Sequence, residues 1–143
     1  MIDLVENRLT EGNLRVTQPR KLIMQVLCGS EAAVSQADIE KSLDNQVDRV
    51  TVYRTLKSFE EAGIIHKITD TDAVAKYALC LDDCHKGSAH SHNHAHFHCT
   101  ACGNTTCLNS VHIEVPDLPK GYLVSETKLI MSGLCAACLV KAG

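Results

Sequence analysis

The N-terminal part of the chain carries apolar residues at the spacing of amphipathic helices. Residues 3–10 predict a short first helix. Its expected apolar side consists of Leu4, Val5 and Leu9. Thr17 is placed to cap a second helix that runs to about Cys28, and Pro19 in its first turn gives up no helical hydrogen bond.

Two more helices are predicted, with a tight polar turn between them. Ser35 is expected to cap the first of the two, with Asp38 three residues later forming a capping box. Asp48 is expected to cap the second, which covers residues 49–61. The turn between them is expected at Asp44–Gln46.

Two short apolar segments after these helices predict a pair of strands. They are residues 64–68 and 76–79, and they flank the polar turn Thr69–Asp72. Three helices, a tight turn between the last two, and a hairpin together predict a winged helix-turn-helix domain over residues 1–80. A helical core that happens to carry a hairpin fits the same periodicity.

A polar segment with Gly and Ser, residues 81–93, is expected to link this domain to a second one. Beyond the linker, alternating apolar and polar residues predict a small sheet. The expected strands are His94–Thr100, Leu123–Ser125 and Lys128–Met131. Residues 94–143 are therefore expected to form a small α/β domain, which gives the whole chain an α+β fold.

Composition narrows the class of protein. No apolar run approaches the roughly 18 residues of a membrane span, and the N-terminal sequence carries acidic residues unlike a secretory signal, so we expect a cytoplasmic protein. The net charge of −3 does not by itself indicate nucleic-acid binding. Residues 14–57 contain seven basic and five acidic side chains, a modest local excess of positive charge.

Two CxxC pairs are the strongest chemical signal in the sequence. They consist of Cys99, Cys102, Cys135 and Cys138. Four thiolates in tetrahedral array favour Zn²⁺, and a site closed by four protein ligands is structural, so we expect one structural zinc ion per chain. The 32 residues between the pairs indicate that the metal ties two ends of a sheet together. A redox CxxC or an iron–sulfur cluster fits less well, and no residue pattern indicates a catalytic zinc, so no enzyme activity is expected.

Histidines alternate with small or apolar residues just before the first CxxC. They are His90, His92, His94, His96 and His98. Alternate residues of a strand share one face, so neighbouring histidines can chelate one ion together. A flexible histidine-rich loop that binds metals loosely is the other interpretation, and His98 can equally be a residue that only packs in the sheet.

Several motifs taken in order are similar to the ferric uptake regulator family. They are RVTQPR at 15–20, RVTVYRTL at 49–56, GII at 63–65, HAHFHCTACG at 94–103 and GLCAAC at 133–138. The resemblance covers about residues 10 to 139 and implies a homodimer that binds palindromic double-stranded DNA. It implies that the helix over 49–61 enters the major groove. The residues expected at the DNA are Arg15, Arg20, Arg49, Thr51, Tyr53 and Arg54.

The branch of this family depends on the regulatory metal ligands. Iron- and manganese-responsive relatives use a histidine and two carboxylates at positions that are Ala33, Ala78 and Cys107 in this chain. The zinc-responsive branch is matched by a different set. Those residues are His66, Cys80, His94 and His96, with His92 or Cys107 as the alternative fourth ligand. Three nitrogens and a thiolate suit Zn²⁺, although Cys80 and Cys107 can also be plain buried thiols.

Two departures from the family pattern stand out. Thr127 replaces a histidine that relatives use in a further metal site, and the dimerisation helix expected near 109–121 is short and contains two prolines.

Taken as a whole, the resemblance implies a zinc-responsive repressor of zinc uptake genes with one regulatory zinc ion per chain. An iron- or peroxide-responsive regulator of the same family is the alternative. A metal chaperone or storage protein is the alternative from another class.

Overall fold

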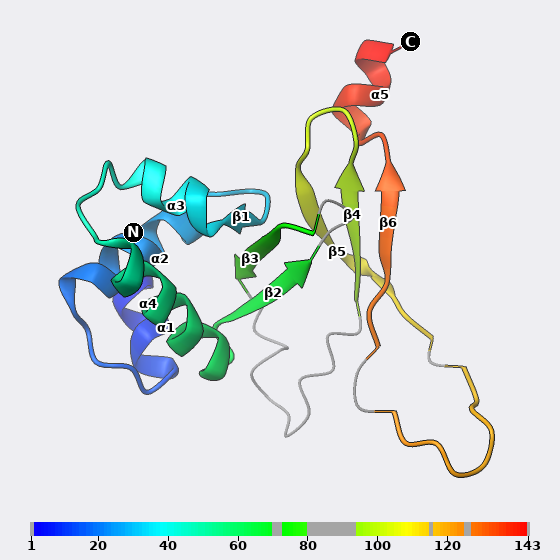
Figure 1. Cartoon of the computed structure of the whole chain (residues 1–143), viewed down its shortest axis with the longest axis horizontal. Helices are drawn as coiled ribbons and strands as arrows, with labels where there is room; N and C mark the ends of the chain where they lie inside the picture. Colours follow the sequence, from blue (N-terminus) through cyan, green and yellow to red (C-terminus); the bar gives the residue numbers. More distant parts are fainter. Residues whose placement is uncertain (1, 70–72, 80–93, 115, 125–126, 143) are drawn as a thin grey trace.

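The computed structural model of the chain describes residues 2–69, 73–79, 94–114, 116–124 and 127–142. The chain forms two units side by side, a helical unit with a small sheet and a second sheet with one helix at its end (Figure 1). The fold is α+β, as predicted. The expected linker, residues 81–93, lies outside the described residues.

Four helices build the N-terminal unit, and capping residues set where they begin. They are α1 (Ile2–Glu11), α2 (Gln18–Cys28), α3 (Gln36–Ser42) and α4 (Arg49–Glu61). Thr17, Ser35 and Asp48 cap α2, α3 and α4, and each side chain accepts a bond from a backbone N–H of the first turn. Asp38 completes the capping box of α3. These predictions are confirmed.

A three-stranded antiparallel sheet, the wing sheet, completes this unit. It consists of β1 (Val34–Ser35), β2 (Ile65–Thr69) and β3 (Ala75–Leu79), in the order β1-β3-β2. The two strands of the predicted hairpin are confirmed, while β1 was not predicted. In the hairpin, His66 lies opposite Ala78 and Ile68 lies opposite Lys76.

One apolar core holds the N-terminal unit together. It includes Val5 and Leu9 of α1, Ile23 and Met24 of α2, Ile39 of α3, Val52, Leu56 and Phe59 of α4, and Ile64 and Ile65. Each of these side chains is at most 2% exposed. Leu4 differs from the prediction, since it is 50% exposed and lies on the outer side of α1.

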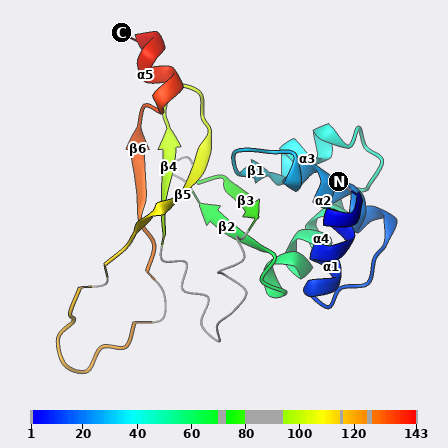
Figure 2. The same ribbon diagram turned by 180° about the vertical axis from the view of Figure 1, so that it is seen from behind.

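The C-terminal unit is a second sheet, the C-terminal sheet, with one short helix. Its strands are β4 (His94–Cys99), β5 (Thr105–His112) and β6 (Ile130–Gly133), in the order β5-β4-β6, and α5 (Ala136–Ala142) follows. Strand β4 is antiparallel to β5 and parallel to β6. Residues 116–124, which lie between β5 and β6 in the sequence, extend away from the two sheets (Figure 2).

The predicted strands of this unit are confirmed only in part. The strand predicted at 94–100 is β4, and the one predicted at 128–131 begins two residues later, at Ile130. Leu123 and Val124 are exposed and belong to no strand, so the prediction of a strand at 123–125 is wrong for its described residues. Among the described residues, no helix combines the length and the apolar character that crossing a membrane requires.

The two leucines of α1 provide a matched test of the core. Leu9→Ala should lower the free energy of unfolding by about 2–5 kcal/mol, because it removes a fully buried side chain. Leu4→Ala on the same helix should change it by no more than about 0.5 kcal/mol. Urea unfolding followed by circular dichroism measures both, and equal losses would contradict the assignment of the core.

Candidate metal centres and nucleic-acid interface

The four predicted cysteines come together at one end of the C-terminal sheet. Cys99 ends β4, Cys102 lies in the turn after it, Cys135 follows β6, and Cys138 lies in α5. Their sulfur atoms all lie within 4.8 Å of one another. Because β4 and β6 are parallel neighbours, the cluster ties the same ends of two adjacent strands, which refines the expectation that it ties two ends of the sheet.

The backbone around Cys99 prepares this sulfur to bind a cation. Backbone N–H groups, first that of Cys102 and then that of Cys135, donate hydrogen bonds to it and lower the pKa of Cys99 to about 5. The N–H of Cys135 lies 3.4 Å from the Cys99 Sγ. Hydrogen bonds with the thiols of Cys135 and Cys99 raise the pKa of Cys138 to about 12. The four thiols thus share their protons as one coupled group, and a divalent ion would take the place of those protons.

The spacing of the sulfurs fits zinc. A regular tetrahedron with Zn–S bonds of about 2.3 Å places its sulfurs about 3.8 Å apart. Cys102 Sγ and Cys135 Sγ are 4.0 Å apart. Gly103, directly after the first pair, has a φ of +79°, a left-handed conformation that glycine adopts without strain. The four-cysteine cluster therefore has the spacing of a four-ligand metal site.

A second cluster lies between the two units and contains His66, His96 and Cys107. His66 Nε2 lies 3.1 Å from His96 Nε2 and 3.2 Å from Cys107 Sγ. His66 belongs to β2 of the wing sheet, whereas His96 and Cys107 lie opposite each other on β4 and β5. Both histidines are at most 6% exposed. The donors of one candidate site thus come from both units.

The arrangement of these three atoms suits a shared ion. A tetrahedral zinc ion places two histidine nitrogens about 3.4 Å apart, and a nitrogen and a sulfur about 3.6 Å apart. The observed separations of 3.1 and 3.2 Å are close to these values. A neutral ring nitrogen has either one proton or one lone pair, so His66 Nε2 cannot bond well to both neighbours by itself. The two clusters are consistent with two metal sites in the chain.

The predicted regulatory ligands are only partly represented in this cluster. His66 and His96 are present, and the thiol is that of Cys107, which the sequence offered as an alternative ligand. Cys80 and His92 lie outside the described residues, as does the side chain of His94. The backbone of His94 pairs with that of His112, and the register of β4 against β5 shifts between His94 and Ala95.

His98 has a different environment from His96, although both lie on the same face of β4. It is 3% exposed, and its Nδ1 lies 3.1 Å from the hydroxyl of Thr105, its cross-strand neighbour. Cys28 is also not part of either cluster. Burial raises the pKa of the Cys28 thiol, which packs against the N-terminal core. His98 therefore follows the interpretation that it only packs in the sheet.

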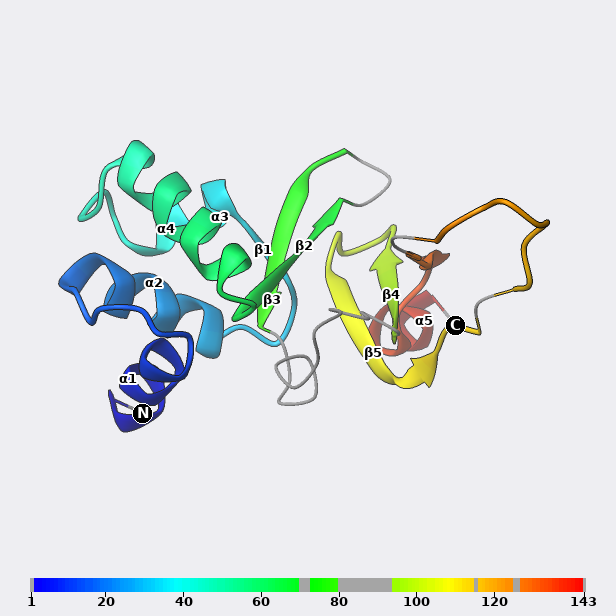
Figure 3. The same ribbon diagram turned by 90° about the horizontal axis from the view of Figure 1, so that it is seen from below.

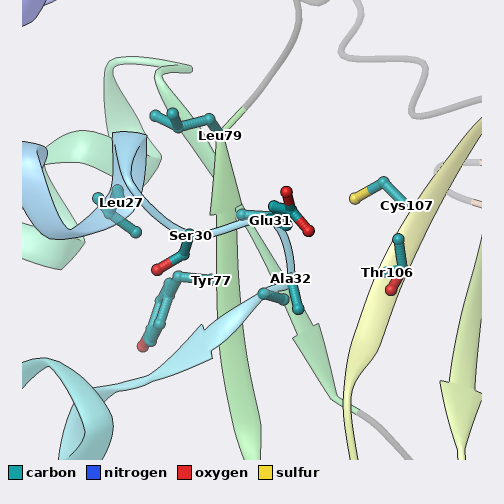
Figure 4. Close-up of a pocket in the computed structure, with 10 residues that line it drawn as sticks. Leu27, Ser30, Glu31, Ala32, Tyr77, Leu79, Thr106 and Cys107 are labelled. Atoms are coloured by element: carbon teal, nitrogen blue, oxygen red, sulfur yellow. The ribbon is translucent and has the colours of Figure 1, made fainter. Parts of the chain in front are cut away.

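A cavity of about 170 Å³ adjoins the second cluster. It is lined by the loop after α2, by β3 and by Thr106 and Cys107 of β5. Figure 4 shows the sulfur of Cys107 pointing toward the side of the cavity where Glu31 lies. The junction between the units is therefore not fully packed beside the cluster.

The residues predicted to contact DNA lie on or near the surface of the N-terminal unit. Tyr53 is 53% exposed on α4. Arg54 and Arg15 are also exposed. The side chain of Arg49 is 83% exposed and lies 3.4 Å from Glu40.

Two of the predicted residues also make contacts within the chain. The hydroxyl of Thr51 bonds to the cap residue Asp48, and this bond lowers the pKa of the Asp48 carboxyl. Arg20 donates to the backbone carbonyl of Arg15 over 2.8 Å. Thr51 and Arg20 therefore hold the start of α4 and the segment before α2 in position.

Replacing Cys99 with serine should remove one zinc ion per chain. The change deletes one of four sulfur ligands from a site that ties β4 to β6, so the C-terminal unit should lose its ordered structure. Metal content measured by mass spectrometry and near-ultraviolet circular dichroism report the result. Cys28→Ser is the matched control and should keep full metal content. Unchanged zinc in the Cys99 variant would contradict the site.

Comparisons with known proteins agree on one family. The sequence profile of the ferric uptake regulator family matches residues 11–120. The chain is 28% identical over 140 residues to the transcriptional regulator FurA of Mycobacterium tuberculosis, covering 93% of this chain and 88% of that protein. It is 29% identical over 140 residues to the peroxide operon regulator of Bacillus subtilis, covering 93% of this chain and 90% of that protein.

Solved structures share the fold. A zinc uptake regulator in complex with zinc and DNA superposes with a TM-score of 0.70 at 23% identity, covering 99% of this chain and 95% of that one. The ferric uptake regulator of Vibrio cholerae superposes with a TM-score of 0.61 at 23% identity, covering 91% of this chain and 98% of that one. At these identities the likeness supports the fold alone.

Proposed function

The chain belongs to the ferric uptake regulator family, so it is a metal-responsive, DNA-binding transcriptional regulator and not an enzyme, and we propose that the metal it senses is zinc. The cluster of His66, His96 and Cys107 carries this proposal. It would act in the cytoplasm as a repressor of zinc uptake genes.

The donor chemistry supports zinc over iron or manganese. Two imidazoles and a thiolate are soft and borderline ligands of the kind that Zn²⁺ prefers, whereas sites for harder ions are rich in carboxylates. Cys107 takes the place of a carboxylate that iron-responsive relatives use, by the resemblance described above. We propose that the four-coordinate shell is completed by Cys80 or His94, with His92 as the alternative.

The position of the cluster supports a regulatory role. His66 is fixed to the DNA-binding unit, while His96 and Cys107 are fixed to the C-terminal sheet, so an ion held by all three would favour one angle between the units. An ion stabilises the arrangement that binds it better. In a dimer the angle between the units sets the separation of two α4 helices, and half-sites one helical turn apart require about 34 Å.

Exposed apolar residues support a homodimer. In the described part of the C-terminal unit, only Ala95 and Cys99 are buried hydrophobic residues, and α5 buries none of its side chains. Meanwhile Tyr122 and Leu123 are 71% and 92% exposed. A sheet must cover its apolar face against another element, and a second copy of the chain would provide that cover.

The alternative within the family is a regulator that responds to iron or peroxide. The relatives named FurA and peroxide operon regulator favour it, since they match most of the chain. The two hypotheses differ in which ion restores DNA binding to protein that retains only the four-cysteine zinc. Family membership favours both of them over a storage or delivery protein.

His66→Ala should abolish zinc-dependent binding to the DNA upstream of the protein's own gene. The change removes the ligand of the DNA-binding unit but leaves the four cysteines intact. Gel shifts at buffered free zinc measure the response, and the variant should still retain one zinc ion per chain. Cys28→Ser is the control and should bind DNA as the natural protein does. Binding that persists in the His66 variant, or that Fe²⁺ restores and Zn²⁺ does not, would contradict the proposal.

Arg54→Ala should weaken operator binding by about 1–3 kcal/mol if Arg54 contacts a base. The side chain is exposed on α4 and is not needed for the core. Fluorescence anisotropy with specific and scrambled DNA separates base reading from general attraction to phosphate. An equal loss on both DNAs would assign Arg54 to the backbone, and no loss would remove it from the interface.

A further inference from the structure

The two sheets face each other through two adjacent rows of polar side chains. On the wing sheet, His66 and Ala78 are opposite neighbours, and Lys76 lies two residues before Ala78 on the same face. On the C-terminal sheet, His96 lies opposite Cys107, and the next pair on that face is His98 opposite Thr105. Figure 3 shows the wing sheet and the C-terminal sheet side by side in this orientation. The first row is the metal cluster described above.

The second row joins the units without a metal ligand. Lys76 Nζ donates to the carbonyl of Gly103 over 2.6 Å and to the hydroxyl of Thr105 over 3.2 Å. Thr105 is completely buried, and its hydroxyl also contacts His98 Nδ1 at 3.1 Å. The backbone N–H of Ala33, beside β1, donates to the carbonyl of Thr105 over 2.8 Å. Thr105 thus receives contacts from two separate segments of the DNA-binding unit.

One acceptor in this row belongs to the turn of the four-cysteine site. Gly103 directly follows Cys102, and its N–H donates to the carbonyl of Cys99 over 2.9 Å. The carbonyl that receives the Lys76 ammonium is therefore positioned by the same turn that presents two of the sulfurs. The side chain of Lys76 therefore links the DNA-binding unit to the turn of the four-cysteine site.

We propose that Lys76 is a positioning residue for the regulatory site. With Thr105 and the Gly103 carbonyl, it forms a metal-independent latch that holds His66 near His96 and Cys107 before an ion binds. The latch lies two residues along the strands from the cluster, which is about 7 Å, because alternate residues of a strand share one face. The latch would raise the affinity for the metal, because ligands that are already assembled do not have to be brought together at the expense of binding free energy. This inference rests on the proposed regulatory role of the cluster.

The size of the effect follows from the donor and the acceptors. A hydrogen bond from a charged group to a partly buried acceptor stabilises more than a neutral bond does, and its loss should lower the affinity for the regulatory ion about tenfold. A methionine at position 76 would remove this donor from the carbonyl of Gly103. The four-cysteine zinc should stay bound, because none of its sulfurs contacts Lys76 in the hydrogen bonds described above.

The test compares Lys76→Met with Lys67→Met in the full-length protein loaded with one zinc ion per chain. Lys67 lies on β2 of the same hairpin and is exposed, so its variant loses the same charge but not the latch. Competition with a chromophoric chelator measures the affinity for the second zinc ion. We expect about a tenfold loss for Lys76→Met and none for Lys67→Met.

A second measurement separates failure of the latch from failure of the regulatory site. Small-angle X-ray scattering of the protein with one zinc ion should show a wider distribution of shapes for Lys76→Met than for the natural protein or Lys67→Met. If the natural protein binds no second ion, the proposed function fails, and scattering alone decides on the latch. Equal scattering of all three proteins would overturn the latch. The latch would also be overturned if Lys76→Met lost affinity for the second ion only when it also lost the first zinc ion. That result would indicate that Lys76 has a merely structural role.

Discussion

The contact of His66 with His96 and Cys107 is the constraint on which the arrangement of the two units depends. Burying imidazoles between two sheets is unfavourable unless their polar atoms find partners. One ring nitrogen of His66 faces both a nitrogen and a sulfur, an arrangement that a cation can bridge. In the proposed function, a bound cation would therefore favour one angle between the units.

The C-terminal unit explains why a second kind of site is present. The N-terminal unit has a continuous apolar core, whereas the described residues of the C-terminal sheet contribute none to it. Small units with little core commonly depend on metals or on association for their stability. The four cysteines fasten β4 to β6 and to the start of α5, and this gives the sheet a fixed edge. A rigid C-terminal sheet is a condition for any signal that passes through His96 and Cys107.

The sequence predicted the N-terminal unit well because its signals are local. Caps such as Ser35 and Asp48, and apolar residues at helical spacing, act within a few residues of one another. The C-terminal unit was predicted less well. Strand β5 mixes polar and apolar residues without strict alternation, β1 has only two residues, and α5 begins between the two cysteines of a CxxC pair. These elements form because of pairing and metal geometry, which local patterns do not report.

The metal ligands also divide into those that local sequence signals predict and those that depend on strand pairing. The four cysteines were predicted from spacing alone, because a CxxC pair places both sulfurs by local turn geometry. The presence of Cys107 in the second cluster depends on which residue of β5 lies opposite His96, and that is a matter of strand register. Cys107 was therefore visible in the sequence only as an alternative ligand, because no local signal reports that register.

A polar junction suits a sensor better than an apolar one would. An apolar interface between the units would hold them at one angle whether or not an ion was bound, and DNA binding would then not depend on metal. Here the junction consists of the cluster of His66, His96 and Cys107 and of a neighbouring row centred on Lys76. In the proposed mechanism, the Lys76 row keeps the ligands near each other, and an ion bound by the cluster adds the free energy that favours one arrangement. Since coupling between two sites is a difference in free energy between arrangements, that division of roles would let a single ion alter the position of α4.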